Sequence, residues 1–327
     1  MKRGNTVRKL LALILSVVLV ATMLSMMGAG GTAKAAVAQD KTVAGLSTSG
    51  IKAPKAPDTR FDEWTGSYVW YGKYDGTPVK YRVLAPKTTI YGGTTMLFDC
   101  DSILYTAPFD EDDVANSGAL NPSEWKYSDV KAGLNGSAFL TKANGFTTIE
   151  KNAIAKSTIA SHKLVEGESE GQVEEWIKRT CVNYVALSGE KIFLLDGEEA
   201  SNRAYGYYLG CYYSQEEVKG RIKRNVVYDG ISMWLLRSAV IEIYCGCVYS
   251  DGTVGWQYLD YAIGVSPAFN VNLSSVIFSS VVTGTAGQDN AEYKLTLADS
   301  NLTVGIANGK TGSISGSKVT IPYVISG

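Results

Sequence analysis

Histidine and cysteine, which build many catalytic centres, are scarce in this sequence. One histidine, His162, and five cysteines occur among 327 residues. A single histidine excludes a multi-histidine metal site and leaves one conceivable Ser-His-Asp arrangement. A histidine in a polar Ser-His-Lys segment is usually an exposed loop residue. We therefore expect no enzyme activity, no metal site and no cofactor.

Cysteine is also too sparse for a fold built on disulfide bonds. The odd total leaves at least one thiol unpaired, and a chain of this length can bury a core without disulfide bonds. All five follow residue 35, at Cys100, Cys181, Cys211, Cys245 and Cys247. We expect disulfide bonds to be optional here.

An excess of charge of either sign is missing as well. The chain has 31 Lys and Arg against 32 Asp and Glu, so its formal net charge is -1. Nucleic acid binding needs a concentrated basic surface, so we expect no nucleic acid partner. Tyrosine is abundant instead, with 20 residues, and it suits recognition surfaces as well as strands.

Long apolar runs are limited to one, from Leu10 to Met27. Basic residues precede this run, and Ala33-Lys34-Ala35 follows it, which is the order of a secretory signal peptide. A membrane anchor is the alternative, but Ser16, Thr22 and Ser25 dilute the run. We predict a signal peptide at residues 1–35, an extracellular or cell-surface location, and no membrane span after cleavage.

The rest of the chain divides into three predicted parts. Residues 36–62 lack periodicity and contain two prolines, as a flexible linker does. Residues 63–280 mix strand and helix patterns, which predicts an α+β domain. Residues 281–327 begin with small residues and then alternate as strands of an immunoglobulin-like sandwich. Because such a sandwich needs roughly 100 residues, we expect only the start of that domain.

Within residues 63–280, several segments have recognisable local patterns. A β-hairpin is predicted at Tyr68–Leu84 around an Asp75-Gly76 turn. Further strands are predicted at Thr94–Cys100 and Lys191–Leu195. Helices are predicted at Ser128–Leu140, Thr147–Ala155 and Gly171–Cys181, the second with Thr147 or Thr148 and Glu150 as a capping signal.

The segment from Met233 to Leu273 carries the most information. It begins and ends with strand patterns and contains the turn Ser250-Asp251-Gly252. A three-residue loop with Gly252 in the left-handed conformation would pair Tyr249 with Thr253 and Val248 with Val254. This register puts both valines on the buried side, so we prefer it to a two-residue loop.

Large aromatic and polar residues around these valines follow no propensity rule. Such side chains on strand edges and loops of a rigid frame form binding surfaces. The candidate ligand-binding residues are Ile241, Glu242, Ile243, Tyr244, Cys247, Tyr249, Trp256, Gln257, Tyr258, Asp260 and Tyr261.

A set of short segments lies between Tyr68 and about Ser280: Tyr68–Tyr74, Trp125–Val130, Leu134–Gly136, Phe139–Leu140, Phe193–Leu195 before Glu199-Ala200, Tyr205-Gly206, Trp234–Ser238, Ser250–Gly252 and Gly264–Ala268. Taken together they resemble a bacterial family of exported domains of unknown function. The resemblance implies a C-type-lectin-like fold akin to that of the formylglycine-generating enzyme.

The resemblance also implies a way in which the binding surface could vary. Some members of this group resemble targets of diversity-generating retroelements, in which codons near the end of the lectin-like domain are randomised. The irregular residues between Ala239 and Ala262 fit such a cassette. Glu242, Trp256 and Gln257 cannot arise from the commonest randomised asparagine codon, and a fixed binding surface is the alternative.

Two functions of other classes remain open. A formylglycine-generating-type oxidase would use Cys245 and Cys247, which point the same way from a strand, although no further metal ligand accompanies them. A structural module of the cell surface would have no specific ligand. We favour a secreted or surface-displayed binding protein whose partner is a protein or a carbohydrate outside the cell.

Overall fold

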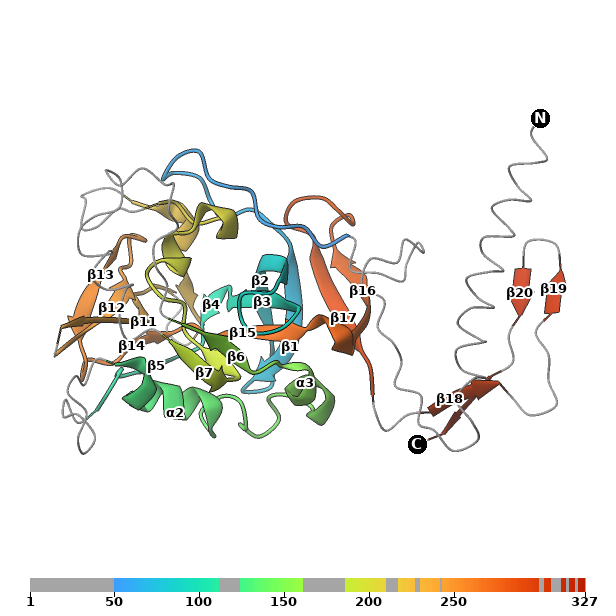
Figure 1. The fold of residues 1–327 in the computed structure, drawn as a ribbon. Coiled ribbons are helices and arrows are strands. Elements are labelled where there is room, and N and C mark those ends of the chain that lie inside the picture. The colour runs from blue at the N-terminus through green and yellow to red at the C-terminus, as the bar shows by residue number, and fades with distance from the viewer. Residues whose placement is uncertain are drawn as a thin grey trace. The chain divides into compact units, whose positions relative to one another are not determined.

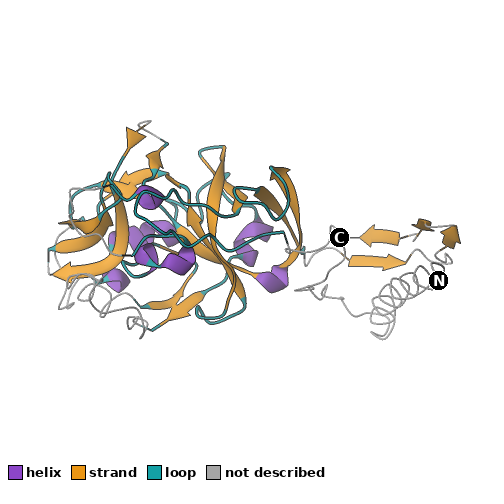
Figure 2. Cartoon of the chain, turned by 90° about the horizontal axis from the view of Figure 1, so that it is seen from above, coloured by secondary structure: helices purple, strands orange, loops and turns teal. Residues whose placement is uncertain are grey.

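The computed structural model describes residues 50–111, 124–160, 186–209, 217–226, 230–241, 243–299, 303–306, 313–315, 318–320 and 323–326. This part of the chain is mixed α+β, with most of its regular structure in several sheets and little in helices (Figure 2). The α+β class predicted from the sequence is confirmed at this level. The predicted signal peptide and residues 36–49 of the predicted linker lie outside the described residues.

The chain divides into two units, of which Val37–Leu297 is the larger. A seven-stranded sheet runs through the larger unit (Figure 1). In spatial order its strands are β16 (Val276–Thr283), β17 (Glu292–Leu297), β1 (Tyr68–Tyr74), β2 (Thr77–Thr88), β3 (Thr95–Cys100), β15 (Ala268–Asn272) and β8 (Ile192–Phe193). The predicted hairpin is confirmed as β1 and β2, because Asp75 and Gly76 between them both have positive φ angles.

A second sheet of five strands lies at the other end of the larger unit from β16 and β17 (Figure 1). Its spatial order is β13 (Val254–Tyr258), β12 (Tyr244–Val248), β11 (Trp234–Ile241), β14 (Ile263–Val265) and β5 (Tyr105–Ala107). The predicted closing strand Gly264–Leu273 is therefore two strands, since β14 belongs to this sheet and β15 to the seven-stranded one. Smaller pairings join β10 (Gly230–Ile231), β9 (Arg224–Asn225) and β4 (Ser102–Ile103), and also β6 (Ser157–Ile159) and β7 (Leu187–Glu190).

The described helices are short. They are α2 (Asp129–Asn135) and α3 (Thr148–Ala153), with single 3₁₀ turns at Trp125–Tyr127, Glu199–Ser201, Arg203–Tyr205, Lys219–Arg221 and Leu273–Ser275. The capping signal of the second predicted helix is confirmed, because Thr147 and Glu150 form a capping box. The first predicted helix ends five residues early, at Asn135 before Gly136. The helix predicted at Gly171–Cys181 lies outside the described residues. Among these helices, none is long and apolar enough to cross a membrane.

An aromatic cluster fills the core beside the seven-stranded sheet. The ring of Phe269 on β15 lies 4.9 Å from that of Tyr81 and 5.4 Å from those of Phe98 and Tyr71, measured between centroids. Phe146, before α3, contacts the same ring at 6.1 Å. Edge-on and tilted packing of this kind stabilises beyond the buried area alone.

The N-terminal edge of the larger unit differs from the prediction. Residues 50–62 were expected to belong to a flexible linker, but Ile51 is buried. The amide of Lys52 donates to Ser67 Oγ at 2.9 Å, and the amide of Lys55 donates to the carbonyl of Thr65 at 2.8 Å. Pro54 and Pro57 are buried as well. This segment therefore packs onto the domain.

The C-terminal edge also differs from the prediction at residue 280. Strand β17 pairs in parallel with β1, with Tyr68 opposite Glu292, and in antiparallel with β16. Tyr293 is buried, and its hydroxyl donates to the carbonyl of Gly50 at 2.5 Å. The small residues from Val281 to Gly287, where the second domain was expected to begin, form the end of β16 and the following turn. The larger unit thus ends at Leu297 rather than 280, because the strand that completes its sheet comes from the segment assigned to the second domain.

The residues after Leu297 contain two further strand pairs. Strand β18 (Thr303–Ile306) pairs with β21 (Tyr323–Ser326), and β19 (Ser313–Ser315) pairs with β20 (Lys318–Thr320), all in antiparallel. Strand texture was predicted for this segment, but its first expected strand, at Tyr293–Leu297, belongs to the larger unit.

Candidate ligand-binding face

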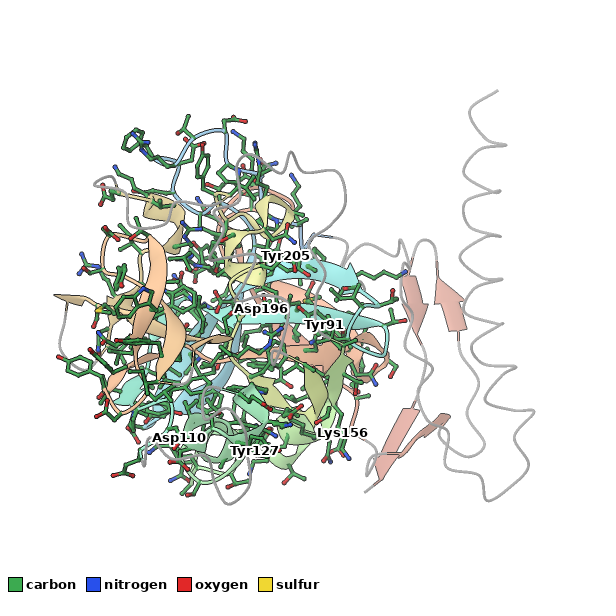
Figure 3. The ribbon with its side chains drawn as sticks, turned by 60° about the vertical axis from the view of Figure 1, so that its left-hand side comes forward. Tyr91, Asp110, Tyr127, Lys156, Asp196 and Tyr205 are labelled. Atoms are coloured by element: carbon green, nitrogen blue, oxygen red, sulfur yellow. The ribbon has the colours of Figure 1, made fainter. Side chains whose placement is uncertain are left out.

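Strand β11 is the base on which the candidate site is built, and a buried arginine anchors it. Arg237 lies in an irregular stretch of the β11–β12 pairing, so its amide donates to Leu195 instead, at 2.9 Å. Its guanidinium donates to Asp196 Oδ2 at 2.8 Å and to Glu199 Oε1 at 2.9 Å. All three side chains are buried. Asp196 lies in the same part of the larger unit as Tyr91 and Tyr205 (Figure 3), and the Tyr91 hydroxyl also donates to Glu199.

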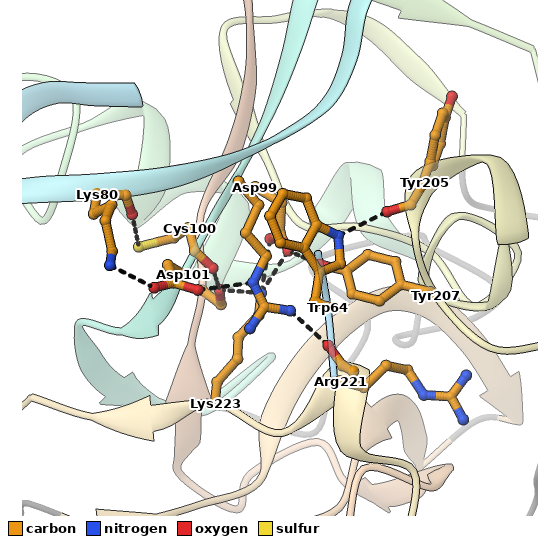
Figure 4. Close-up of polar contacts among 12 residues, drawn as sticks. Trp64, Lys80, Asp99, Cys100, Asp101, Tyr205, Tyr207, Arg221 and Lys223 are labelled. Carbon is orange, nitrogen blue, oxygen red and sulfur yellow. Dashed lines mark hydrogen bonds and ion pairs between the residues drawn. The ribbon is translucent and has the colours of Figure 1, made fainter. Parts of the chain in front are cut away.

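A second buried ion pair supports the segment beneath the hairpin. The ammonium of Lys223 donates to both oxygens of Asp99, at 2.8 and 2.7 Å, and to Ser266 Oγ at 2.7 Å (Figure 4). It also lies 4.0 Å from the ring centroid of Trp234, the first residue of β11. Burial lowers the pKa of Lys223, while the Asp99 carboxylate acts in the opposite direction. Paired charges thus fix the start of β11 at Trp234 and its middle at Arg237.

The turn that joins β12 to β13 has the predicted three-residue form. Tyr249 donates its amide to Thr253 at 2.8 Å, Val248 lies opposite Val254, and Gly252 has φ +79. The turn is also held from outside, because Arg221 Nε donates to the Gly252 carbonyl at 2.6 Å. The hairpin is therefore rigid at this end.

The inner side chains of the hairpin were predicted correctly. Val248, Val254, Trp234, Leu236 and Val265 are all fully buried. Trp234 lies opposite Val248, and its indole N–H donates to the carbonyl of Arg221 at 3.2 Å. This partner satisfies the polar atom that a buried tryptophan carries.

Three aromatic side chains gather at the other end of the hairpin. Tyr244 lies opposite Tyr258, and Gly246 lies opposite Trp256, so these residues share one side of the two strands. The ring centroid of Tyr244 is 4.3 Å from that of Trp256 and 4.7 Å from that of Tyr258. A Cβ at Gly246 would lie 3.0 Å from the Cβ of Ser238, so the missing side chain allows β11 to pack closely against β12.

The exposed part of this cluster includes neighbouring loops. Tyr258 is 48% exposed, Tyr261 57% and Ile243 40%. The amide of Leu259 donates to the carbonyl of Ile243 at 3.2 Å, and that of Tyr261 donates to the carbonyl of Tyr258 at 3.2 Å, which joins the three positions. We call Ile243, Tyr244, Trp256, Tyr258 and Tyr261 the aromatic face.

Of the remaining candidates, Asp260 lies next to this face in the chain and two cannot be placed. Gln257 was also expected on the binding surface, but it lies opposite Cys245, on the other side of β13 from Trp256 and Tyr258. Asp260 is exposed and Gln257 is half-buried, and the Gln257 side chain accepts the amide of Tyr258 at 2.9 Å. The backbone of Ile241 lies opposite Tyr244 at the end of β11. The side chain of Ile241 and all of Glu242 lie outside the described residues.

Cys247 was expected on the binding surface, but it lies on the opposite side of β12. Residues 245 and 247 alternate with 244 and 246 along the strand. Cys245 and Cys247 are fully buried, opposite Ala239 and Leu235. Burial raises the pKa of both thiols. They are core residues, so the accessible cysteine pair that an oxidase would need is missing from these positions.

Tyr249 is also turned away from the aromatic face. Its ring lies over Gly255, where an added Cβ would meet the ring at 2.1 Å. Its hydroxyl donates to the carbonyl of Trp256 at 2.9 Å. Tyr249 thus braces strand β13 from the side that carries the cysteines.

The single histidine and the acidic segment Asp110–Asp113 provide no second site within the described residues. His162 lies outside the described residues, as do Asp112 and Asp113. Asp110 is buried, with its amide donating to the carbonyl of Leu259 at 3.1 Å. No cluster of three metal-ligating side chains occurs within the described ranges.

The buried cluster of Arg237, Asp196 and Glu199 was missed by the sequence reasoning. A signal for it existed, since Arg237 follows Trp234-Leu235-Leu236 in a strand pattern. Arginine is almost never fully buried unless it is paired. A charged residue in an apolar strand therefore predicts a buried carboxylate partner, although not which one.

Comparison of the chain with protein-family models, with curated proteins and with solved structures finds no match. The family resemblance therefore remains a prediction, and function is argued from the geometry of the site.

Proposed function

We propose that this protein is an exported ligand-binding protein that uses the aromatic face on a C-type-lectin-like frame. The observation that carries the proposal is the exposed group formed by Ile243, Tyr258 and Tyr261, backed by Tyr244 and Trp256. Large aromatic side chains on a fixed frame dominate recognition surfaces, because they supply contact area at low entropic cost.

The rigidity of the frame supports the same function. The turn at Gly252, the buried valines and the Arg237 anchor hold the hairpin from one end. The aromatic face lies at the other end and contributes little to the core. A binding surface built in this way loses little conformational entropy when a ligand binds.

We also propose that the sequence of this face varies, but at fewer positions than the whole segment between Ala239 and Ala262. Between Ala239 and Ala262, the exposed or half-buried positions could change without loss of packing. Cys245, Cys247 and Leu259 could not, since they are fully buried. We propose in the same way that the larger unit has a C-type-lectin-like fold and that the residues after Leu297 begin an immunoglobulin-like domain.

We favour a protein partner for the aromatic face over a carbohydrate. Its exposed residues are tyrosines and an isoleucine on a strand end and two turns, with Asp260 beside them. Tyrosine-rich surfaces with scattered polar groups are typical of protein recognition.

The test compares residues 36–327 with the double variant Tyr258→Ala/Tyr261→Ala. Both are applied to an array of bacterial surface proteins and to printed glycans. Removing two exposed rings should leave the melting temperature within a few degrees, because exposed positions usually change stability by only about 0.5 kcal/mol. The affinity of the double variant for the array proteins that the wild type binds should be at least tenfold lower.

Ile90→Ala is the matched control, since Ile90 is 49% exposed and lies outside the aromatic face. It should bind as the wild type does. Wild-type binding to glycans alone would overturn the protein partner. An array signal that survives in the double variant would overturn the face itself.

A further inference from the structure

A pocket of about 400 Å³ lies beside the hairpin β1–β2. None of the residues that line it belongs to the aromatic face. Trp70 and Tyr74 on β1, Thr77 on β2, Ser102 on β4 and the exposed Val226 line it. Its volume is within the range of roughly 300 to 1,000 Å³ that small-molecule sites occupy.

The aromatic wall of the pocket has its polar atom already bound. The indole N–H of Trp70 donates to Glu292 Oε2 at 2.7 Å. Trp70 is half-buried, so its ring offers an apolar surface and no hydrogen-bond donor. The backbone at Trp70 is also occupied, because it pairs with Lys80 on β2 and with Lys294 on β17. The indole donor and the backbone of β1 at Trp70 are therefore not available to a peptide chain.

The uncharged polar side chains that line the pocket carry hydroxyl groups. Within the part of the chain that the structure describes, the hydroxyls of Tyr74, Thr77 and Ser102 take part in no hydrogen bond. Each can donate one hydrogen bond and accept others. A ligand with several hydroxyl groups of its own would satisfy them.

The charges around the pocket compensate one another. The Lys80 ammonium lies 3.5 Å from Asp101 and 3.4 Å from Glu292. Asp75, at the hairpin turn, lies 3.0 Å from the Lys142 ammonium. An ionic ligand would have to displace one of these partners, whereas a neutral ligand would not.

From these observations we infer that the pocket binds a neutral saccharide. The apolar C–H face of a sugar ring packs on the Trp70 ring, and its hydroxyl groups exchange hydrogen bonds with Tyr74, Thr77 and Ser102. Val226 closes the outer side of the pocket. This site is independent of the aromatic face, so the chain would hold a protein and a saccharide at two places.

The experiment is saturation-transfer NMR of residues 36–327 with five neutral disaccharides: cellobiose, maltose, lactose, mannobiose and chitobiose. At least one should receive saturation on its ring protons with a Kd of about 1 mM or tighter, which this method detects. Trp70→Ala should weaken that binding at least tenfold. Val226→Lys should weaken it similarly by placing a long side chain at the rim, and it leaves the sheet untouched because Val226 is 58% exposed.

Ile90→Lys is the control for an added exposed lysine, and it should bind as the wild type does. A decaproline peptide serves as the competing ligand class, and it should receive no saturation. The inference is overturned if none of the five disaccharides binds, if decaproline binds in their place, or if binding persists in both Trp70→Ala and Val226→Lys. Retained protein binding by the aromatic face in the same variants would show that the two sites are separate.

Discussion

Gly252 shows how one residue position fixes the hairpin. Its φ of +79 is unfavourable for a residue with a Cβ. A Cβ there would also lie 2.0 Å from the carbonyl oxygen of Val218. Val218 is held in place, because its amide donates to the carbonyl of Asp251 at 2.7 Å. The left-handed turn and the close approach of segment 217–222 thus both require glycine.

We expect Gly252→Ala to lower the free energy of unfolding by about 3 kcal/mol or more, since backbone strain and a clash with a backbone atom act together. Gly76→Ala is the matched control. Gly76 has φ +81 but no atom within 4 Å of an added Cβ, so it should cost about 1 to 2 kcal/mol. Urea unfolding of both variants gives the comparison, and equal losses would contradict the role of the Val218 contact.

The buried thiols lead to a second prediction. Burial raises the pKa of Cys100 to about 12 and raises those of Cys245 and Cys247 as well. A thiol that is protonated and inaccessible reacts slowly. Iodoacetamide at pH 8 should therefore leave these three cysteines unmodified in the folded protein and label them in urea, as measured by peptide mass spectrometry. Rapid labelling of Cys247 in the folded state would contradict its burial and show that it lies on the surface.

Replacing Cys247 by Ser should also destabilise the domain, by about 1 to 3 kcal/mol, because it buries a hydroxyl in an apolar site. The sequence analysis instead placed Cys247 on the binding surface, where a change to Ser would have little effect on stability. Thermal melting of Cys247→Ser against the wild type distinguishes the two expectations.

At the scale of elements, local sequence patterns were sufficient to predict the hairpins. They were not sufficient to predict which sides of the strands are buried. The Asp75-Gly76 turn and the register at Asp251-Gly252 follow from a few neighbouring residues, so both could be predicted. The burial of Cys245 and Cys247 depends on what covers the second side of β12, which is determined by residues far away in the sequence. An alternating pattern cannot reveal that both sides are covered.

The Arg237 anchor allows a prediction about β11. Arg237→Ala would leave the carboxylates of Asp196 and Glu199 buried without their cation, which should cost about 3 to 5 kcal/mol. Lys55→Ala is the control, because the Lys55–Asp58 pair is 67% and 76% exposed and should contribute almost nothing. Chemical denaturation measures both. A loss for Arg237→Ala as small as that for Lys55→Ala would contradict the anchoring role.

At the scale of the whole molecule, the position of β17 changes where the larger unit ends. The sequence indicated a boundary at residue 280 because small residues follow it. Nothing local in Glu292–Leu297 shows that this strand pairs with β1, since parallel pairing between distant segments leaves no pattern in either one. The α+β class and the strand at Tyr293–Leu297 could therefore be predicted, but the sheet to which this strand belongs could not.

We predict that residues 37–298 fold cooperatively and that residues 37–280 do not. The shorter chain lacks the strand between β16 and β1 and the buried Tyr293 side chain. Tyr293→Ala in the longer chain is the intermediate case, with an expected loss of about 3 to 5 kcal/mol. Calorimetry of the three proteins provides the test, and a cooperative transition of residues 37–280 near that of the longer chain would contradict the boundary at Leu297.

The pairing of β1 with β17 also affects the order in which the molecule can fold. The hydrogen bond from Trp70 to Glu292 joins residues 222 positions apart. During synthesis, the outer edge of β1 has no neighbour until almost the entire larger unit has left the ribosome. Contacts of such long range form slowly, and an unpaired strand edge is prone to aggregation meanwhile. Completion of the seven-stranded sheet is thus a late event, which can take place only after residues 292–294 have been synthesised.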